Sequence, residues 1–176
     1  LTSGPMPGEN FLFGLFNRIG ETLPAMAIAR QGVSMARGRQ SAVVRAAAET
    51  VVDQLVEMVQ PFAESAFAAH RAAGRPIVLA TTTPYDLVKP LADALGFDDA
   101  IATRYATDDE GVYDGTLDGP FVWSAGKLEA IRRWAGERGI DLAESWAYSD
   151  SFYDAPMLDA VGHPVVVNPD PRLVLM

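Results

Sequence analysis

The chain has 176 residues, of which 49% are hydrophobic, so it can bury a core, and no apolar run reaches the roughly 18 residues that a membrane-spanning helix needs. Its formal net charge of -9 argues against nucleic acid and anionic membranes as partners, because binding either requires a basic surface. The absence of cysteine excludes disulfides, thiolate nucleophiles and cysteine-based zinc sites, and together these properties predict a soluble cytoplasmic protein.

The first third of the chain is predicted to be helical. Between residues 11 and 60, segments rich in Ala, Val, Met and Arg are interrupted near Pro24 and around Gly38, and none of them shows the alternation of a strand. We interpret residues 11–60 as a small helical bundle.

From Pro61 onward, helical segments alternate with short runs of β-branched residues. Strands that alternate with helices of about ten residues indicate a parallel sheet with right-handed crossovers, so the predicted fold class is α/β. Gly111–Phe121 is the exception, because its turn residues predict a hairpin flap. The predicted helices are Pro61–Ala73, Tyr85–Leu95, Lys127–Arg138 and Asp154–Val161, and the predicted strands are Ile77–Ala80, Ala100–Thr103, Trp146–Tyr148 and Val165–Val167.

Two carboxylates follow one of the predicted strands. The apolar run Trp146–Tyr148 stops just before Asp150, and Asp154 comes four residues later. Ligands of open α/β sheets bind at the carboxyl ends of strands, so Asp150 lies where a hard cation or a phosphate is expected. The alternative is that both residues cap the next helix, since Asp is favoured at helix N-termini. The pattern alone does not decide between these interpretations.

Three hydroxyls follow another predicted strand. Ile77–Ala80 leads directly into Thr81, Thr82 and Thr83, and a helix opens after Pro84. Hydroxyls and free backbone N–H groups at a helix N-terminus form an anion site. The same residues would also fit an ordinary threonine cap with Pro84 in the first helical position, which is the better interpretation of an isolated Thr-Pro pair.

A lysine opens a later predicted helix, in the pair Gly126-Lys127. A lysine at this end of a helix faces the unfavourable end of the dipole, unless an anion lies nearby. Beside a phosphate at about 4 Å, the attraction is roughly 4 kcal/mol at an effective dielectric constant of about 20. Surface lysines are common, so the informative feature is the order: hydroxyls after one strand, a lysine at a later helix, and Asp-x-x-x-Asp after the next strand.

These features together resemble the haloacid dehalogenase superfamily of phosphohydrolases, and within it the phosphoserine-phosphatase-like branch, subfamily IB. The resemblance implies a Rossmann-like three-layer core with a parallel sheet at residues 61–176, a hairpin flap at residues 111–121 and a helical cap at residues 11–60. It rests on five groups of residues in the same order as in the family: Val78–Pro84, Ala102–Tyr105 with Leu117–Pro120, Gly126–Glu129, Tyr148–Ser151 with Asp154–Leu158, and Val161–Val165 with Asn168–Pro171.

The resemblance also implies roles for individual residues. Thr81 would bind the transferring phosphoryl group through its hydroxyl, helped by backbone N–H groups of the two threonines that follow it. Lys127 would neutralise charge on the phosphate and on the nucleophile. Asp150 would ligate Mg²⁺, and Asp154 would orient the metal shell or Lys127. These roles suit phosphoryl transfer, which depends mainly on positioning and on charge stabilisation.

The family's first motif is not found in this sequence. Members carry Asp-x-Asp-Gly-Thr at the end of their first strand, where the first Asp is the nucleophile and the second is the general acid and base. A leucine usually follows that motif, and the chain begins at Leu1, so we expect a parent protein with about one additional strand, followed by residues 1–10 as a linker. That strand would lie at the centre of the sheet, and its absence would leave a groove between two strands. We therefore expect these residues alone to be inactive and poorly stable.

Two functions of different class remain open. The first is a Mg²⁺-dependent phosphomonoesterase that acts on a small phosphorylated metabolite, with phosphoserine among the candidates, through an aspartyl-phosphate intermediate. The second is a non-catalytic binding or regulatory module that has lost the first motif. The presence of Thr81, Lys127, Asp150 and Asp154 favours the enzyme. Hydrolysis of a carbon–halogen bond fits these residues less well than metal-dependent phosphate chemistry does.

Overall fold

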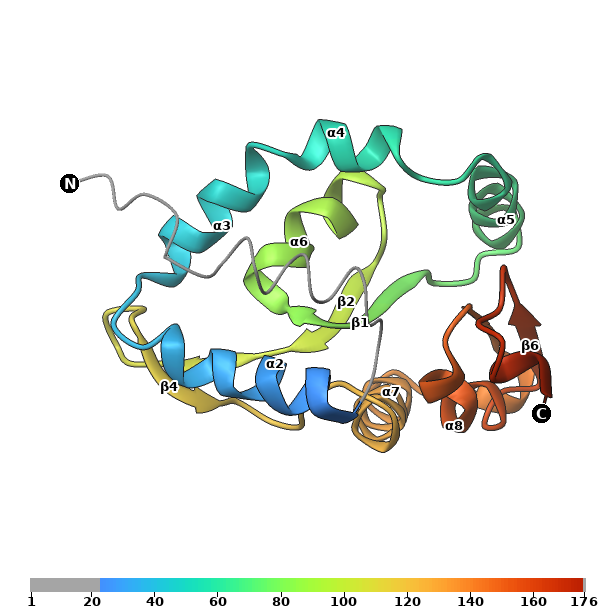
Figure 1. The fold of residues 1–176 in the computed structure, drawn as a ribbon. Coiled ribbons are helices and arrows are strands. Elements are labelled where there is room, and N and C mark those ends of the chain that lie inside the picture. The colour runs from blue at the N-terminus through green and yellow to red at the C-terminus, as the bar shows by residue number, and fades with distance from the viewer. Residues whose placement is uncertain (1–22, 176) are drawn as a thin grey trace.

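Two short parallel sheets and the helices around them form the centre of the computed structural model, which describes residues 23–175 (Figure 1). The helices are α2 (Leu23–Met35), α3 (Ser41–Glu49), α4 (Val52–Glu57), α5 (Pro61–Ala72), α6 (Tyr85–Ala94), α7 (Ala125–Glu137) and α8 (Ala155–Leu158). The strands are β1 (Val78–Pro84), β2 (Asp99–Thr103), β3 (Tyr105–Thr107), β4 (Tyr113–Leu117), β5 (Trp146–Ser149) and β6 (His163–Val166), and the 3₁₀ turns are η1 (Leu142–Glu144), η2 (Phe152–Asp154) and η3 (Leu173–Leu175). The predicted linker at residues 1–10 and the start of the predicted bundle lie outside the described residues.

The four strands predicted after residue 61 form parallel pairs, as the alternating pattern predicted. β1 pairs with β2 so that Leu79 lies opposite Ala100, and β5 pairs with β6 so that Ala147 lies opposite Pro164. Among the described strands, the antiparallel pair is β3 and β4. Within the described part of the chain, β1–β2 and β5–β6 are two separate sheets, so β1 and β5 each have one unpaired edge. This is the arrangement expected for a parallel sheet without its central strand.

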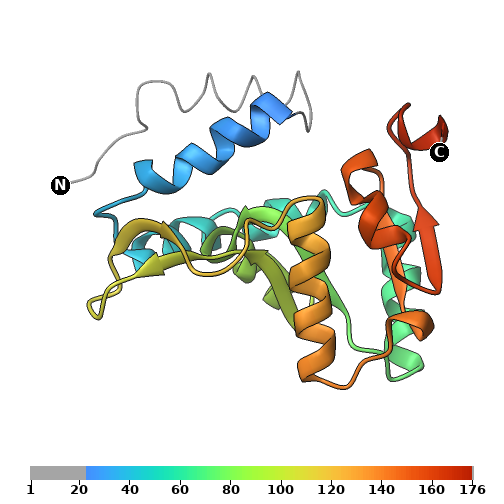
Figure 2. The same ribbon diagram turned by 90° about the horizontal axis from the view of Figure 1, so that it is seen from below.

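A cavity of about 650 Å³ lies between β1 and β5, and we call it the central channel. Helix α5 lies on one side of the channel and α7 on the other, so helices flank the space between the two sheets (Figure 1 and Figure 2). Its lining is largely apolar and includes Phe67 of α5, Ala80 of β1, Ile131 of α7 and Ala147 of β5. The groove that we expected between two strands of the core is therefore present.

Buried apolar residues of the described chain form two core clusters. Val88 and Ala92 of α6 pack against Ala100 and Ala102 of β2, and all four side chains are buried. The other core lies between α7, β5 and α8 and also includes Ile101 of β2, with Val78 and Ala80 of β1 packed against it, so it spans both parallel sheets. Small residues at these contacts let helix and strand approach closely, which fixes where the carboxyl ends of β1 and β5 lie.

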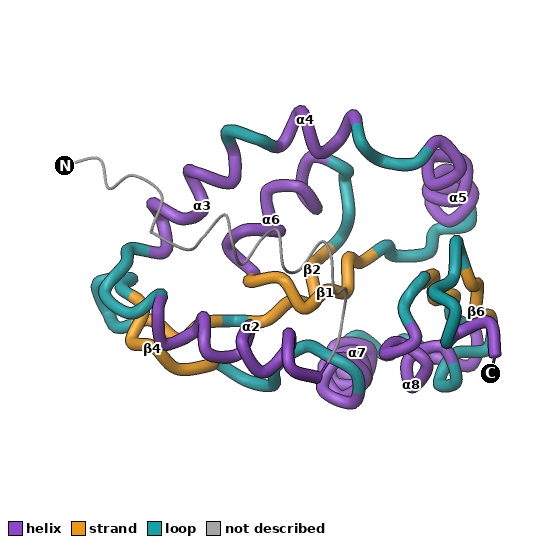
Figure 3. The backbone as a smooth tube through the Cα atoms, viewed as in Figure 1, coloured by secondary structure: helices purple, strands orange, loops and turns teal. Residues whose placement is uncertain are grey.

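The N-terminal helices pack on the hairpin and on α6. Helices α3 and α4 contact α6, and α2 contacts β4 (Figure 3). Backbone hydrogen bonds join the segment between α2 and α3 to the hairpin: Gly38 N–H donates to Tyr113 O at 2.9 Å, and Ser41 N–H donates to Gly111 O at 3.0 Å. The helices and the hairpin thus form one hydrogen-bonded unit beside α6. Of residues 23–175, no helix combines the length and apolar character that crossing a membrane would require.

Most predicted elements differ from the structure by a residue or two at an end, and the predicted strand Ile77–Ala80 continues as β1 to Pro84. Two others differ for reasons that the contacts explain. The predicted helix Asp154–Val161 is shorter, consisting of η2 and α8. After it, Gly162 comes so close to η1 that an added Cβ would lie 1.7 Å from a carbonyl oxygen, so the chain turns into β6 earlier than predicted. The hairpin also begins before the predicted flap at 111–121, because the carboxylate of Asp108 accepts the N–H of Val112 at 2.9 Å and closes the turn there.

Candidate active site

A buried ion pair joins α7 to the turn after β5. Nζ of Lys127 lies 2.6 Å from Oδ1 of Asp154, and only 5% and 8% of these side chains are exposed. Oδ2 of Asp154 accepts a hydrogen bond of 2.7 Å from the hydroxyl of Ser149, the last residue of β5. Because buried charges are stable only when they are paired and hydrogen-bonded, this arrangement fixes the lysine ammonium near the carboxyl end of β5.

The same geometry shows whether Asp150 and Asp154 act as helix caps. Asp154 is the N-cap residue of α8 but makes no side-chain hydrogen bond to that helix, because its carboxylate is committed to the ion pair. Asp150 does not cap a helix: the N-cap residue of η2 is Ser151, whose hydroxyl accepts the N–H of Tyr153 at 3.2 Å. The interpretation of these carboxylates as simple helix caps is therefore wrong.

A close backbone contact holds the start of α7. A Cβ added to Gly126 would lie 2.2 Å from the carbonyl oxygen of Phe121, so the preceding loop approaches the helix more closely than a larger residue permits. The N-cap residue, Ser124, has φ 49, an unfavourable value for a residue with a side chain. Lys127 therefore emerges from a tightly constrained helix start.

Replacing Gly126 with alanine is expected to destabilise the protein by about 1–3 kcal/mol, because the new methyl group must displace backbone. Gly136 lies in the same helix, and a Cβ there would meet nothing within 4 Å. Gly136→Ala should be neutral or stabilising by up to about 1 kcal/mol, since alanine is the better helix former. Urea denaturation of both variants tests this, and equal unfolding free energies would show that the contact at Gly126 does not constrain the helix.

The three threonines lie at the end of β1, where they bond among themselves. The N–H of Thr83 donates to Oγ1 of Thr81 at 3.2 Å, and the two hydroxyls lie 3.1 Å apart. Oγ1 of Thr82 is buried without a hydrogen-bond partner among the described residues. Pro84 is the N-cap residue of α6 rather than its first helical residue, and no side chain caps that helix. The threonine-cap interpretation is therefore wrong, because the start of α6 has no side-chain cap.

Asp150 follows β5 and lines the central channel. Its backbone carbonyl accepts a hydrogen bond of 2.8 Å from the N–H of Asp170, and the residue is exposed. Among residues 23–175, no group of three acidic or histidine side chains could hold a metal ion. Mg²⁺ is usually bound through one or two carboxylates, together with waters and substrate phosphate, so Asp150 fits as one ligand. Asp154 is committed to Lys127, and the described residues therefore supply a single carboxylate to such a site.

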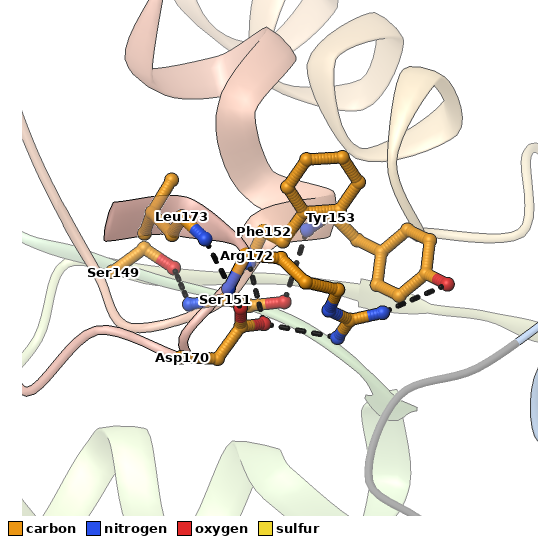
Figure 4. Close-up of polar contacts among 7 residues, drawn as sticks. All are labelled: Ser149, Ser151, Phe152, Tyr153, Asp170, Arg172 and Leu173. Atoms are coloured by element: carbon orange, nitrogen blue, oxygen red, sulfur yellow. Dashed lines mark hydrogen bonds and ion pairs between the residues drawn. The ribbon is translucent and has the colours of Figure 1, made fainter. Parts of the chain in front are cut away.

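Sequence reasoning assigned no role to Asp170. The structure places its carboxylate against the loop that follows β5, where it accepts the N–H of Phe152 at 3.0 Å and that of Arg172 at 2.8 Å (Figure 4). An aspartate between two prolines is typical of a turn stabilised by its side chain, which was the available signal. The contact with Phe152 joins segments that are distant in sequence, so no local pattern predicts it.

Aromatic rings lie beside the start of α7, the helix that carries Lys127. Trp123, in the loop before α7, has its ring 4.8 Å from that of Tyr153. Nε1 of Trp123 is buried without a hydrogen-bond partner in the described part of the chain. The hydroxyl of Tyr153 accepts a bond of 3.3 Å from Arg172. These contacts link the start of α7 to the loop that carries Asp150.

A second polar cluster joins α5 to β5. The ring of Trp146 stacks on that of His163 at 3.9 Å, with the guanidinium of Arg75 3.8 Å from the indole. His70 of α5 is hydrogen-bonded to the hydroxyl of Tyr148 at 2.9 Å. Partial burial lowers the pKa of His70, and the charge of Arg75 lowers it further. We assign His70 and His163 a packing role, because their contacts join α5 to the sheet of β5 and β6.

Comparison with known proteins identifies the family. The model of the haloacid dehalogenase-like hydrolase family matches residues 7–159. A probable phosphatase of Mycobacterium tuberculosis is 42% identical to this chain, over 69% of the chain and 42% of its own length. Phosphoserine phosphatase SerB1 of the same organism is 34% identical, over 82% of the chain and 47% of its own length. The chain belongs to the haloacid dehalogenase-like hydrolase family, which confirms the resemblance seen in its motifs, and it spans about half the length of these curated relatives.

Solved structures agree on the fold. A protein of unknown function from Bordetella pertussis Tohama I matches with a TM-score of 0.77 and 29% identity, covering 95% of this chain and 75% of that one. A phosphoserine phosphatase solved as a phospho-aspartyl intermediate analogue matches with a TM-score of 0.63 and 20% identity, covering 95% of this chain and 77% of that one. These matches confirm the Rossmann-like α/β fold of the family.

Proposed function

We propose that this protein is a Mg²⁺-dependent phosphomonoesterase that acts on a small phosphorylated metabolite. The observation that carries the proposal is the buried pair of Lys127 and Asp154 beside the exposed carboxylate of Asp150, at the end of β5. Membership of a hydrolase family supports it, as do relatives named phosphatase and phosphoserine phosphatase. Phosphoserine is one candidate substrate.

Lys127 would bind the transferring phosphoryl group. Its ammonium is already held by Asp154, so little reorganisation is needed when charge develops in the transition state. At about 4 Å and an effective dielectric constant of about 20, its attraction for one negative charge is roughly 4 kcal/mol. Asp154 thus acts by positioning the lysine.

The phosphate would lie between Lys127 and the end of β1. The hydroxyl of Thr81 and backbone N–H groups near Thr82 and Thr83 would bind its oxygens. The uncapped start of α6 and the unpartnered hydroxyl of Thr82 support this position. Mg²⁺ held by Asp150, with its other ligands from outside the described residues, would neutralise charge on the phosphate oxygens and orient the group.

The nucleophile would come from a strand in the central channel. The 176 residues contain no Asp-x-Asp sequence. We propose that a strand with this motif pairs with the open edges of β1 and β5, and that its first aspartate attacks phosphorus while the departing alkoxide takes a proton from the second. Water then hydrolyses the aspartyl-phosphate. Helices α2–α4 would serve as the cap that excludes bulk water from the site.

The charge and composition of the chain also support a cellular location and a class of binding partner. The acidic charge of -9 and the absence of cysteine support a cytoplasmic enzyme that binds neither nucleic acid nor membranes. Its partner would be the phosphorylated substrate.

A phosphatase assay tests the proposed function. The full-length protein should hydrolyse p-nitrophenyl phosphate or a natural monoester such as phosphoserine, lose this activity in EDTA and regain it with Mg²⁺. Asp150→Asn should reduce turnover at least about 100-fold, because the metal loses a charged ligand. The 176-residue chain alone should be inactive. A folded full-length protein without turnover on a broad panel of monoesters would instead favour a non-catalytic binding module.

A further inference from the structure

One residue near the C-terminus holds both ends of the loop that carries Asp150. The backbone N–H of Asp170 donates to the carbonyl oxygen of Asp150 at 2.8 Å. Oδ2 of Asp170 accepts the N–H of Phe152 at 3.0 Å (Figure 4). Asp170 therefore bonds to the residue before Ser151 and to the residue after it, which fixes the path of this loop.

The carboxylate of Asp170 is itself fully engaged. Oδ1 accepts the N–H of Arg172 at 2.8 Å and that of Leu173 at 3.1 Å, and Oδ2 lies 3.0 Å from the guanidinium of Arg172. Partial desolvation raises the pKa of Asp170, but the hydrogen bonds from Phe152, Arg172 and Leu173 outweigh it and lower the pKa to about 2. These four contacts hold the side chain of Asp170 in one orientation.

The side chain of Asp150 has no comparable support. It is exposed, and no hydrogen bond or ion pair with another described residue orients its carboxylate. The position of the Asp150 carboxylate thus depends on the backbone of Asp150, whose carbonyl oxygen accepts a hydrogen bond from the N–H of Asp170. Residues that orient a metal ligand typically contribute a factor of about 10–100 to metal affinity.

We propose that Asp170 is a positioning residue for the metal site, holding the backbone of Asp150 so that its carboxylate is presented to Mg²⁺. This inference rests on the proposed function. Asp170 would touch neither the metal nor the substrate, and its loss should weaken metal binding more than it slows turnover at saturating metal.

The test compares Asp170→Asn with the wild type in the full-length protein. Asn has the same shape but no charge, and its NH₂ group cannot accept the N–H groups that the carboxylate binds. The Mg²⁺ concentration for half-maximal activity should rise about 10-fold, while kcat at saturating Mg²⁺ should fall less than about 3-fold. Isothermal titration with Mg²⁺ should show the same loss of affinity without any assay of activity.

Asp141→Asn is the matched control. The carboxylate of Asp141 likewise accepts a backbone N–H, from Ala143 at 2.8 Å, but in the turn before β5. This variant should bind Mg²⁺ as the wild type does. If Asp170→Asn does not fold, Asp170→Glu, which keeps the charge but shifts it, should show a smaller loss of affinity in the same direction.

The outcomes separate two kinds of failure. A wild type that binds Mg²⁺ and hydrolyses monoesters, with an Asp170→Asn variant of unchanged Mg²⁺ affinity, would overturn the role of Asp170 alone. A folded wild type that neither binds Mg²⁺ nor hydrolyses monoesters would overturn the proposed function and this inference with it.

Discussion

Replacing Lys127 with methionine is expected to lower the free energy of unfolding by about 3–5 kcal/mol. The methionine keeps most of the volume of the side chain, but it leaves the carboxylate of Asp154 buried without its cation. Urea denaturation of the variant and of the wild type measures the difference. In the full-length protein the same change should reduce phosphatase turnover at least about 100-fold, because a preorganised positive charge is lost from the transition state.

Two controls test whether the loss of stability comes from the buried ion pair rather than from any substitution in α7. Arg133→Ala removes an exposed ion pair with Glu129 on the same helix, where 55% and 62% of the side chains are exposed, and should cost about 0.5 kcal/mol or less. The double variant Lys127→Met with Asp154→Leu should regain most of the stability, since an apolar pair replaces the buried charges. If the double variant is as unstable as the sum of its single changes, the ion pair is not what holds α7 to β5.

Asp86→Ala is expected to destabilise the protein by about 2–4 kcal/mol, because one carboxylate links three parts of the fold. It lies in the first turn of α6, where Oδ1 accepts a bond of 2.9 Å from Arg45 of α3, and Oδ2 accepts one of 2.8 Å from the hydroxyl of Tyr113 in β4. Tyr113 is 2% exposed, so its hydroxyl would be left buried without a partner. Burial raises the pKa of Tyr113, and the bond to Asp86 raises it further, so this hydroxyl remains a donor at working pH.

Asp93→Ala provides the matched control for Asp86. Asp93 lies in the same helix and pairs with Lys89 one turn away, at the surface. Its loss should cost about 0.5 kcal/mol or less, as for other exposed pairs between neighbouring turns. Thermal or urea denaturation of the two variants provides the comparison. Similar losses for both would mean that Asp86 does not couple α3 and the hairpin to α6.

The strands could be predicted because their signals are local. The apolar run that ends before Asp150 and the β-branched run before Thr81 have the length and flanks of buried strands, and both strands are present. The family resemblance implied that Asp154 orients either the metal shell or Lys127, and the structure pairs Asp154 with Lys127. The roles of Thr81, Lys127 and Asp150 in binding phosphate and metal stay predictions.

Other features depend on contacts between distant segments and could not be predicted. The link from Asp170 to Phe152 and the link from Asp86 to Tyr113 each join segments that no periodicity relates. The last helix was predicted too long because its apolar spacing continues to Val161, whereas the close approach of Gly162 to η1 ends it earlier. Such limits are set by tertiary packing rather than by local preference.

A crystal structure of the full-length protein with Mg²⁺ and beryllofluoride, a mimic of the phosphoryl group, tests the central claim most directly. We predict that the metal binds to the carboxylate of Asp150, and that Nζ of Lys127 and Oγ1 of Thr81 each lie within about 3 Å of the mimic. The mimic should be attached to an aspartate on a strand between β1 and β5. Density for the mimic away from Lys127, or a central channel filled by side chains with no strand in it, would contradict the account.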